Sequence, residues 1–498
     1  MAIELYPHQK DDLDALKKHK AFALWHEVGG GKTYPLIYRM MDSFLTDRRM
    51  WIIVAEVQLL DQWKEEIIRV MGDLAPTVEI VTGSTETWKR KLVADNPPNF
   101  LITNYEFFPK MELWLYNLVR KGDVAGMVCD EGHRMKGFRG FRSKSGSRAK
   151  SIVKVAHAAI GTEKDIARYM ASGSPICSPN SPDVWGLYYF MDPNVFGPVL
   201  WKFEEQFFYN TAPPGAMYRT LKLKPGMASE MSRRMYTIAR RLLKTEMPGV
   251  KFPEMRPILY KVDMPDSVSS VYAQMRESCL TFIGDRAITR LMLLARLMAL
   301  QQISSGFILE SKAMMLDENL ILDDKGYLPE KEVIHLDSSH KDKVLWSIID
   351  EIGRDKSIVI WAHFRHELQH IATMLEKEGI STARVWGDED RADKREAIKE
   401  FKEGKRKVLI GQPASAGAGL NLQIAGHSIR YSRSHRLLDL IQSEGRIHRA
   451  SSVEFHETVT YHEIVTKGTY DEYVYESLRA KKDLSSEITL DSFREMRA

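Results

Sequence analysis

Cysteine, long apolar runs and net charge are all scarce in this sequence, and each shortage excludes a class of protein. Its 498 residues contain 3 cysteines, which are too scattered to form a C-x-x-C pair. They favour a reducing compartment and argue against a disulfide framework or a zinc cluster. No apolar run reaches about 18 residues, so we expect no membrane span. The net charge of +4 is too small to identify a partner.

We expect neither a signal peptide nor internal repeats. The N-terminal segment, MAIELYPHQKDD, lacks a charged and then apolar pattern, and no repeat at a solenoid period is found. The composition is that of a globular protein, with 44% hydrophobic and 28% charged residues. Because 498 residues exceed what one hydrophobic core normally holds, we expect two or three domains.

The most informative stretch is Phe22–Thr33, FALWHEVGGGKT, in which a glycine-rich turn joins an apolar strand to a helical segment. Its glycines permit positive φ and close backbone approach, so that successive N–H groups can converge on phosphate oxygens. The helix N-terminus adds partial positive charge. Lys32 would contact the β and γ phosphates, and the Thr33 hydroxyl would contact Mg²⁺. The glycines are Gly29, Gly30 and Gly31.

Two residues near this turn are open to two interpretations. His26 stands where the strict phosphate-loop pattern has its first glycine, so a flexible turn with a surface lysine is the alternative to nucleotide binding. Gln9 lies shortly upstream, on a polar helix that Pro7 can start. It is either a solvated helix residue or an amide that reads the edge of an adenine base.

Strands that alternate with helices predict a doubly wound parallel α/β fold for the first half of the chain. Gly126–Asp130 is a buried strand that ends in Asp130 and Glu131. Carboxylates at the carboxyl end of such a strand lie where an α/β sheet places its ligands. Asp130 would hold Mg²⁺ through water, and Glu131 would polarise the attacking water. A further strand ends in the hydroxyl-rich turn Ser172–Pro175.

The segment Arg134–Lys150 is strongly basic and contains no acidic residue, with Phe138 and Phe141 among its cations. It is either a solvated mobile loop or a flexible grip on a nucleic-acid backbone, for which basic and aromatic residues are suited. The residues that would make this grip are Arg139, Arg142 and Lys144.

Residues 196–330 contain few strand-like runs, and we expect them to form a helical insert and linker between a first lobe, 1–195, and a second lobe, 331–498. The second lobe again alternates strands with helices. Its segment Leu437–Ile447 is expected to be a helix, and Arg446 and Arg449, three residues apart, would share one helical face. This is either a solvated basic face or a source of cations for the γ-phosphate of a nucleotide held between two lobes.

In their order along the chain, these segments resemble the motifs of superfamily 2 helicase-type ATPases, specifically the Snf2-like branch. Glu27–Thr33 resembles motif I, which in this branch usually lacks the leading glycine. Asp130–His133 resembles motif II, and Ser172–Pro175 resembles motif III. The other matches are Tyr6–Gln9 (the adenine-reading motif), Val54–Trp63 (Ia), Thr103–Glu106 (Ib), Arg240–Pro248 (entry to the linker), Trp386–Arg391 (after IV), Ser415–Leu422 (V) and Gln442–Arg449 (VI).

The resemblance covers residues 5–470 and implies two RecA-like lobes that bind ATP and Mg²⁺ between them. The catalytic residues that it implies are Lys32, Asp130, Glu131, Arg446 and Arg449, with Thr33 and Asp130 on the metal. The nucleotide contacts are Gln9, Gly29, Gly30, Gly31, Lys32, Thr33, Gly419 and Gln442. The residues that couple nucleotide state to nucleic acid are His133, Ser172 and Ser174. The candidate nucleic-acid contacts are Asn104, Arg139, Arg142, Lys144, Gly417 and Asn421.

The function implied by the resemblance is an ATP-dependent translocase that moves along double-stranded DNA and remodels DNA or protein–DNA complexes. One alternative is a strand-separating or branch-migrating helicase that acts on forks or junctions, so that forked or single-stranded DNA is a possible partner. The other is a nucleic-acid-binding scaffold or regulator with an inactive ATP site. The compact chain resembles phage or bacterial members of the branch. We therefore expect a monomer, without membrane attachment, in the cytoplasm of a bacterium or of a phage-infected host.

Overall fold

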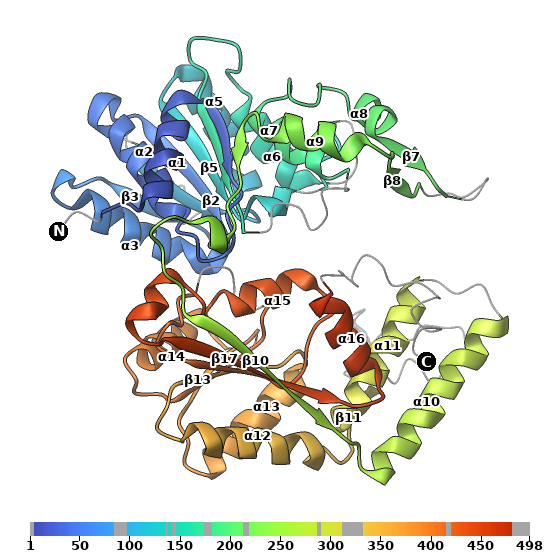
Figure 1. Cartoon of the computed structure of the whole chain (residues 1–498). Coiled ribbons are helices and arrows are strands. Elements are labelled where there is room, and N and C mark those ends of the chain that lie inside the picture. The colour runs from blue at the N-terminus through green and yellow to red at the C-terminus, as the bar shows by residue number, and fades with distance from the viewer. Residues whose placement is uncertain are drawn as a thin grey trace, which may run out of the picture. The chain divides into compact units, whose positions relative to one another are not determined.

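The chain forms two compact units that divide after Phe252 (Figure 1). The first unit holds the residues up to Phe252, and the second holds nearly all residues from Pro253 onward. The computed structural model describes residues 4–83, 97–135, 137–141, 143, 146–173, 182–212, 219–285, 290–310, 332–387, 389–414 and 420–480.

The first unit is built on a seven-stranded sheet in which all neighbouring strands are parallel. The strand order is β3-β4-β2-β5-β6-β1-β9. Alternate residues of β1 enter two separate cores, with Ala21 and Ala23 in one and Phe22 and Leu24 in the other. The strands are β1 (Ala21–Leu24), β2 (Met50–Ala55), β3 (Val78–Val81), β4 (Phe100–Asn104), β5 (Val124–Asp130), β6 (Ala167–Ala171) and β9 (Ala239–Arg240).

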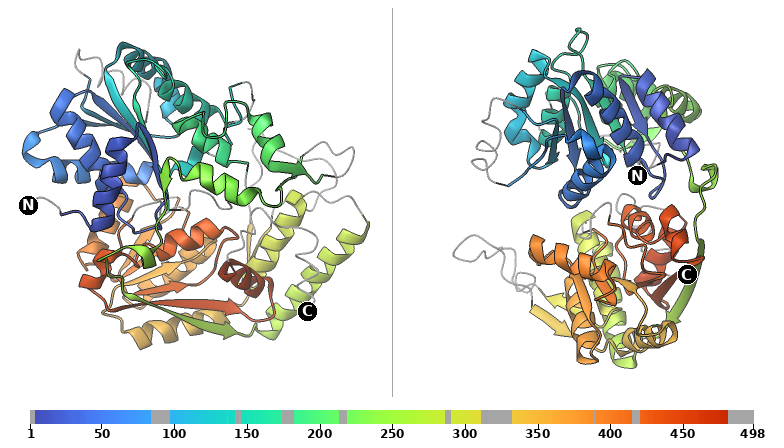
Figure 2. Two further views of the ribbon diagram at one scale, coloured as in Figure 1. Left: turned by 45° about the horizontal axis from the view of Figure 1, so that its top comes forward. Right: turned by 90° about the vertical axis from the view of Figure 1, so that its left-hand side faces the viewer.

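Helices cover both faces of this sheet, as parallel strands with crossover connections require (Figures 1 and 2). The first three helices contribute to one core, and α5, α6 and α7 contribute to the other. A short antiparallel hairpin pairs β7 (Phe208–Asn210) with β8 (Leu221–Leu223). The helices are α1 (Pro7–Lys18), α2 (Thr33–Asp47), α3 (Leu60–Met71), α5 (Glu112–Lys121), α6 (Ser147–Ala156), α7 (Val184–Met191), α8 (Leu200–Phe207) and α9 (Met227–Met235).

The second unit contains a six-stranded parallel sheet with the order β10-β17-β16-β13-β15-β14. An antiparallel pair, β11 (Phe307–Glu310) and β12 (Glu332–His335), lies outside that sheet. The sheet strands are β10 (Glu254–Val262), β13 (Ile358–Trp361), β14 (Thr382–Val385), β15 (Val408–Gly411), β16 (His427–Arg430) and β17 (Thr458–Thr466). The helices are α10 (Asp266–Asp285), α11 (Arg290–Ile303), α12 (Ser339–Ile352), α13 (Arg365–Lys377), α14 (Arg391–Lys402), α15 (Leu437–Glu444) and α16 (Tyr470–Arg479).

The two parallel sheets confirm the expected α/β fold class, with two RecA-like lobes. The expected division into a first lobe, a helical insert and a second lobe differs from the two units that the structure forms. Residues 196–252 belong to the first unit, where β9 pairs with β1, and the described residues of 253–330 belong to the second unit. The reason is β10, which pairs with β17 along all its residues. The sequence does indicate a strand-like run at Arg256–Met264, but local pattern does not show that it pairs with a strand about two hundred residues later.

Among the described residues, no helix combines the length and the apolar character that crossing a membrane would need.

A buried ionic network holds the second unit together. Lys341 is fully buried, and its ammonium group donates hydrogen bonds to Ser305 Oγ (3.0 Å), Tyr431 O (3.2 Å) and Asp471 Oδ2 (3.2 Å). Arg433 pairs with the other oxygen of Asp471, Oδ1, at 2.7 Å. Burial opposes ionisation of Asp471, but the charges of Arg433 and Lys341 outweigh it and lower the pKa of this carboxyl. These two cations therefore stabilise Asp471 as a carboxylate inside the unit.

We expect Lys341→Met to destabilise the second unit by about 3–5 kcal/mol, because Asp471 would keep one cation instead of two in a buried site. The measurement is the urea midpoint of unfolding of the full chain. Lys343→Met, at an exposed position of the same helix, is the matched control and should change stability by about 0.5 kcal/mol or less. Equal midpoints for the two variants would contradict a stabilising role for the buried pair.

Candidate functional site

The glycine-rich turn between β1 and α2 has the backbone conformation that its residues predict. Gly29 has φ +89° and Gly31 has φ +70°, angles that favour glycine. Thr33 is the first residue of α2, and Lys32 immediately precedes it. The Lys32 ammonium group donates to the carbonyl oxygens of His26 (3.1 Å) and Glu27 (3.3 Å). The turn therefore places a cation and a helix N-terminus together, which is a suitable site for phosphate.

Helix α1 braces this turn through polar contacts. Gln9 Nε2 donates to Gly31 O at 2.9 Å, and His8 Nε2 donates to Gly30 O at 3.2 Å. The other end of the Gln9 amide, Oε1, accepts from Tyr6 N at 2.9 Å. A Cβ added to Gly31 would lie 2.4 Å from Gln9 Nε2 at a φ of +70°, so a larger residue would be strained there and would displace the Gln9 amide. In this structure the Gln9 amide holds the turn, and its contact with adenine stays a prediction.

His26, the residue that breaks the strict phosphate-loop pattern, belongs to a buried anchor. Its Nε2 atom lies 2.8 Å from Asp12 Oδ2, and both side chains are fully buried. Arg240 Nη1 donates to the other oxygen of Asp12 at 3.1 Å. Burial lowers the pKa of His26, although the bond to Asp12 opposes this. The sequence analysis did not predict this anchor. Its one signal in the sequence is Asp12, an acidic residue four positions before the buried Leu16 of α1.

The carboxylate pair lies at the carboxyl end of β5, as expected. Asp130 Oδ2 accepts from Trp63 Nε1 at 2.9 Å, and Oδ1 accepts from Glu131 N at 2.9 Å. The Tyr105 hydroxyl donates to the backbone oxygen of Asp130 at 2.6 Å. Burial, reinforced by the charge of Glu131, raises the pKa of Asp130 above its ordinary value. Trp63 and Tyr105 were missed as site residues, although both lie within or next to segments that resemble motifs Ia and Ib.

Glu131 is held by a strained backbone and two side chains. Its φ of +49° is unusual for a residue other than glycine and costs about 1–3 kcal/mol. Glu131 Oε2 accepts from Ser172 Oγ at 3.0 Å, and His133 Nδ1 lies 3.2 Å from both oxygen atoms. Burial opposes its ionisation, but His133, the charge of Lys32 and the Ser172 bond outweigh burial and lower the pKa of Glu131. The structure thus brings together the turn, the carboxylate pair and Ser172.

The residues at this site fit ATP with Mg²⁺. Asp130 is a carboxylate whose pKa is raised by burial and by the neighbouring charge of Glu131, which a bound cation would offset, and Thr33 adds a hydroxyl at the start of α2. Mg²⁺ is typically held by one or two carboxylates together with phosphate oxygens and water. Over the described ranges, no group of three or more histidine, cysteine or acidic side chains could hold a metal alone. A metal shared with phosphates would not need such a group.

In the second unit, the prediction of a helix over Leu437–Ile447 was wrong at the C-terminal end. Helix α15 stops at Glu444, so Arg446 and Arg449 do not share a helical face. Arg446 is 2% exposed, and its carbonyl oxygen accepts from Leu422 N at 3.1 Å. Arg449 Nε donates to Gly445 O at 3.1 Å. Gly445 ends the helix, which lets the chain turn Arg446 into the interior. Gln442 is also buried, on α15 itself.

The candidate nucleic-acid contacts have partners within their own units. Asn104 Oδ1 accepts from Phe107 N at 2.7 Å, and its amide nitrogen lies 3.3 Å from Thr82 Oγ1. Arg139 pairs with Glu204 at 3.0 Å. Asn421 bonds to Gln423 at 3.1 Å. Their roles toward nucleic acid stay predictions. The residues Arg142, Lys144, Ser174, Gly417 and Gly419 lie outside the described residues.

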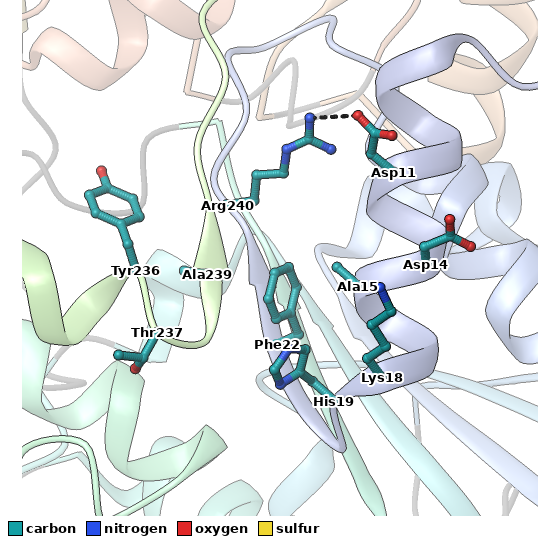
Figure 3. A pocket seen from close by; sticks show the side chains of 10 residues that line it. All are labelled: Asp11, Asp14, Ala15, Lys18, His19, Phe22, Tyr236, Thr237, Ala239 and Arg240. Carbon is teal, nitrogen blue, oxygen red and sulfur yellow. Dashed lines mark hydrogen bonds and ion pairs between the residues drawn. The ribbon is translucent and has the colours of Figure 1, made fainter.

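A separate pocket of about 500 Å³ lies beside the face of α1 that carries Asp11, Asp14 and Lys18 (Figure 3). Arg240 lines it and pairs with Asp11 at 3.0 Å. Its charged side chains are of both signs, and it includes neither the glycine turn nor the carboxylate pair. The lining residues are Asp11, Asp14, Ala15, Lys18, His19, Phe22, Tyr236, Thr237, Ala239 and Arg240.

A parallel sheet with a glycine-rich turn after one strand and a carboxylate pair after another defines a nucleotide-binding protein of the RecA-like class. The SNF2-related domain model matches residues 13–307, and the helicase conserved C-terminal domain model matches residues 340–451. The first match spans more than half of the chain. The chain therefore belongs to the SNF2-related family of superfamily 2 helicase-type ATPases. Members of this family use ATP, typically with Mg²⁺.

Protein p41 of Acyrthosiphon pisum secondary endosymbiont phage 1 is 25% identical over 490 residues, covering 96% of each chain. The ATP-dependent helicase fft1 of Schizosaccharomyces pombe is 21% identical over 505 residues, which is 94% of this chain and 50% of the yeast protein. The chain thus spans half the length of that relative. The Sulfolobus solfataricus SWI2/SNF2 ATPase core in complex with dsDNA is 17% identical, with a TM-score of 0.39 over 100% of this chain and 97% of that one.

We expect Gly31→Ala to weaken ATP binding by about tenfold or more, because the new methyl group would collide with Gln9 at a positive φ. Gly161→Ala is the matched control, since Gly161 has φ +75° and nothing within 4 Å of the added Cβ. It should cost about 1–2 kcal/mol of stability and leave ATP binding unchanged. Equilibrium binding of ATP measures both. An equal loss of affinity in both variants would contradict a specific effect of the methyl group on the phosphate-binding turn.

Proposed function

We propose that the chain is a DNA-dependent ATPase that translocates along double-stranded DNA and remodels DNA or protein–DNA complexes. The observation that carries this proposal is the Glu131 carboxylate, whose pKa is lowered beside Lys32 and which is oriented by Ser172 and His133. A degenerate ATP site would have no need of a strained, ionised glutamate. Membership of the SNF2-related family supports DNA as the partner, because resemblance to the Snf2 branch implies movement along duplex DNA.

Within the first unit, each side chain has a distinct role in this proposal. Lys32 leaves the carbonyl oxygens of the turn and binds the β and γ phosphates. Thr33 and Asp130 would hold Mg²⁺, which, when bound, neutralises charge on the phosphate oxygens. Glu131 accepts a hydrogen bond from the attacking water and polarises it. Trp63 holds Asp130 in place by donating to one of its oxygens.

Arg446 and Arg449 of the second unit are proposed to stabilise the charge that develops on the γ-phosphate. The hydrogen-bonded group of Glu131, His133 and Ser172 is proposed to report nucleotide state to the DNA-binding residues, because His133 and Ser172 both contact the hydrolytic carboxylate. Cycles of ATP binding and hydrolysis would then alternate grip on the DNA backbone through phosphate contacts, which carry little sequence information.

Steady-state ATP hydrolysis tests the proposal and separates it from its alternatives. The reaction is measured without nucleic acid and then with single-stranded DNA, plain duplex, forked DNA and RNA. Stimulation mainly by plain duplex would support translocation on double-stranded DNA. Stimulation mainly by single strands or forks would favour a strand-separating or branch-migrating helicase. Absence of hydrolysis under every condition would leave a nucleic-acid-binding scaffold.

Glu131→Gln should abolish ATP turnover and retain ATP binding, because the amide cannot accept a proton from water but has nearly the same shape. Turnover is measured with the stimulating DNA, and binding is measured at equilibrium. Glu163→Gln, at an exposed turn of the same unit, is the control and should leave both unchanged. Turnover by Glu131→Gln within about threefold of the unmodified chain would remove Glu131 from the catalytic role.

Neutralising Arg139, Arg142 and Lys144 together should weaken DNA binding and flatten its dependence on salt. Each DNA phosphate that the variant no longer neutralises should reduce the slope of log affinity against log salt by about 0.9. Arg219→Gln is the control, because Arg219 also pairs with Glu204 (2.7 Å) but lies outside the basic segment. An unchanged salt slope in the triple variant would show that the segment does not contact DNA.

A further inference from the structure

The segment that joins the two units is anchored at both of its ends by residues of the candidate site. It comprises residues 241–252, between β9 in the first unit and the start of the second unit at Pro253. In Figure 1 it is the light-green stretch that leads into β10. We call this segment the connector. Its first anchors lie in the first unit alone, and its last anchor lies in the second unit alone.

The N-terminal part of the connector is attached to the phosphate-binding turn through Glu27. Glu27 N donates to Leu242 O at 3.1 Å, and Glu27 Oε2 accepts from Lys244 N at 2.7 Å. Met247 is 5% exposed. Its methyl group lies 2.5 Å from the position that a Cβ on Gly30 would take. The carbonyl of Glu27 is also an acceptor for the Lys32 ammonium group. One residue therefore contacts both the phosphate-binding lysine and the connector.

Pro253, the residue that follows the connector, is attached to the segment of the second unit that carries Arg446 and Arg449. We call this the arginine segment. His448 Nε2 lies 2.9 Å from Pro253 O, and because a carbonyl oxygen can only accept, this nitrogen carries the proton. The next residue, Glu254, donates its N–H to Glu457 O at 2.8 Å. His448 is 6% exposed and lies between Arg446 and Arg449 in the sequence. The first residue of the second unit is thus bonded to the segment that carries both arginines.

Between these anchors lie only residues 248–252. Gly249 has φ +73°, and Pro248, Gly249 and Lys251 are exposed. Val250 N donates to Met247 O at 3.4 Å, a long bond at the start of this stretch. A stretch this short, with exposed residues and one glycine at positive φ, can rotate but can absorb little translation.

We propose that the connector is a coupling element in which Glu27 and His448 are positioning residues. The inference rests on the proposed function, in which Lys32 binds phosphate and Arg446 and Arg449 act on it. When Lys32 moves to phosphate it leaves the carbonyl of Glu27, the residue that holds Leu242 and Lys244. The resulting adjustment of the turn passes through residues 248–252 to Pro253 and His448, and so positions the arginines.

A passive tether would behave differently, and the difference can be measured. Lengthening a flexible tether from five to seven residues lowers the effective concentration of its ends by about 1.7-fold, since closure probability falls as the 3/2 power of length. A coupling element loses its register when two residues are added. We therefore insert Gly-Ser between Gly249 and Val250. The matched control carries the same insertion between Glu163 and Lys164, in an exposed turn of the first unit.

The readouts are kcat for DNA-stimulated ATP hydrolysis and the equilibrium Kd for ATP. The connector insertion should lower kcat by about tenfold or more while Kd stays within about threefold, because binding by the first unit is retained. The control insertion should leave both within about twofold. A connector variant with kcat within about twofold of the unmodified chain would overturn the proposal in favour of a passive tether. If the unmodified chain itself hydrolyses no ATP, the proposed function fails, and the coupling fails with it.

A second pair of variants tests the anchor on the second unit. His448→Ala removes the donor to Pro253 O, whereas His448→Gln keeps an N–H group at a similar position. We expect the alanine variant to lower kcat by about tenfold and the glutamine variant to restore it to within about threefold, with Kd for ATP unchanged in both. Equal kcat values for the two variants, with both proteins folded by circular dichroism, would exclude this bond as a coupling contact.

Discussion

Two carboxylates placed side by side at the end of a buried strand repel each other, and much of the first unit serves to hold them. Trp63 and the Glu131 N–H donate to Asp130, while Ser172 donates to Glu131, with His133 in contact. These donors come from α3, from the turn after β5 and from the end of β6, so a continuous parallel sheet is needed to bring them together. The charge of Lys32 acts on both carboxylates. A bound Mg²⁺ would further offset the negative charge of the carboxylates, and phosphate groups would offset the charge of Lys32. A site with these charges therefore suits ATP.

The phosphate-binding turn depends on a second buried network of hydrogen-bonded and charged side chains, which come from α1, from His26 and from β9. The pair of His26 and Asp12 is fully buried and is bonded to Arg240 of β9. Burial of a charged group is costly unless it is paired, and here pairing joins three segments that are distant in sequence. Because Arg240 immediately precedes the connector, the geometry of the turn and that of the connector are linked through shared contacts. Glu27 strengthens this link by holding the next residues of the connector.

The second unit also contains buried charged side chains, which pair with one another in a larger ionic network. Glu463 on β17 is 1% exposed and lies within 3.4 Å of Arg430, Arg433 and Arg479. Arg433 continues to Asp471, which also binds Lys341. These contacts join the ends of β16 and β17 to α12 and α16, next to the turn in which Arg446 is buried. Partners on every side make such a network directional, so it can hold the arginine segment in one arrangement.

Local pattern alone determined the strands that carry the site. The apolar runs at β1, β2, β4, β5, β13 and β15 indicate buried parallel strands, and the fold class follows from them. The order of short motifs identified the family, because each motif depends on residue type and spacing within a few positions. The carboxylates and the glycine turn were therefore placed correctly before any tertiary contact was known. The roles of Arg446, Arg449 and the nucleic-acid contacts stay predictions.

What only the tertiary structure decided involves partners far apart in the chain. Strand β17 lies inside the sheet although it contains polar residues such as His462 and Glu463, and there Glu463 pairs with Arg430, Arg433 and Arg479. The boundary after Phe252 arises because β10 pairs with β17, about two hundred residues later. The same holds for the pair of His26 and Asp12, and for the helix that ends before Arg446. Periodicity reports a residue's neighbours along the chain, whereas a charge becomes stable inside a protein only through the partner that folding brings to it.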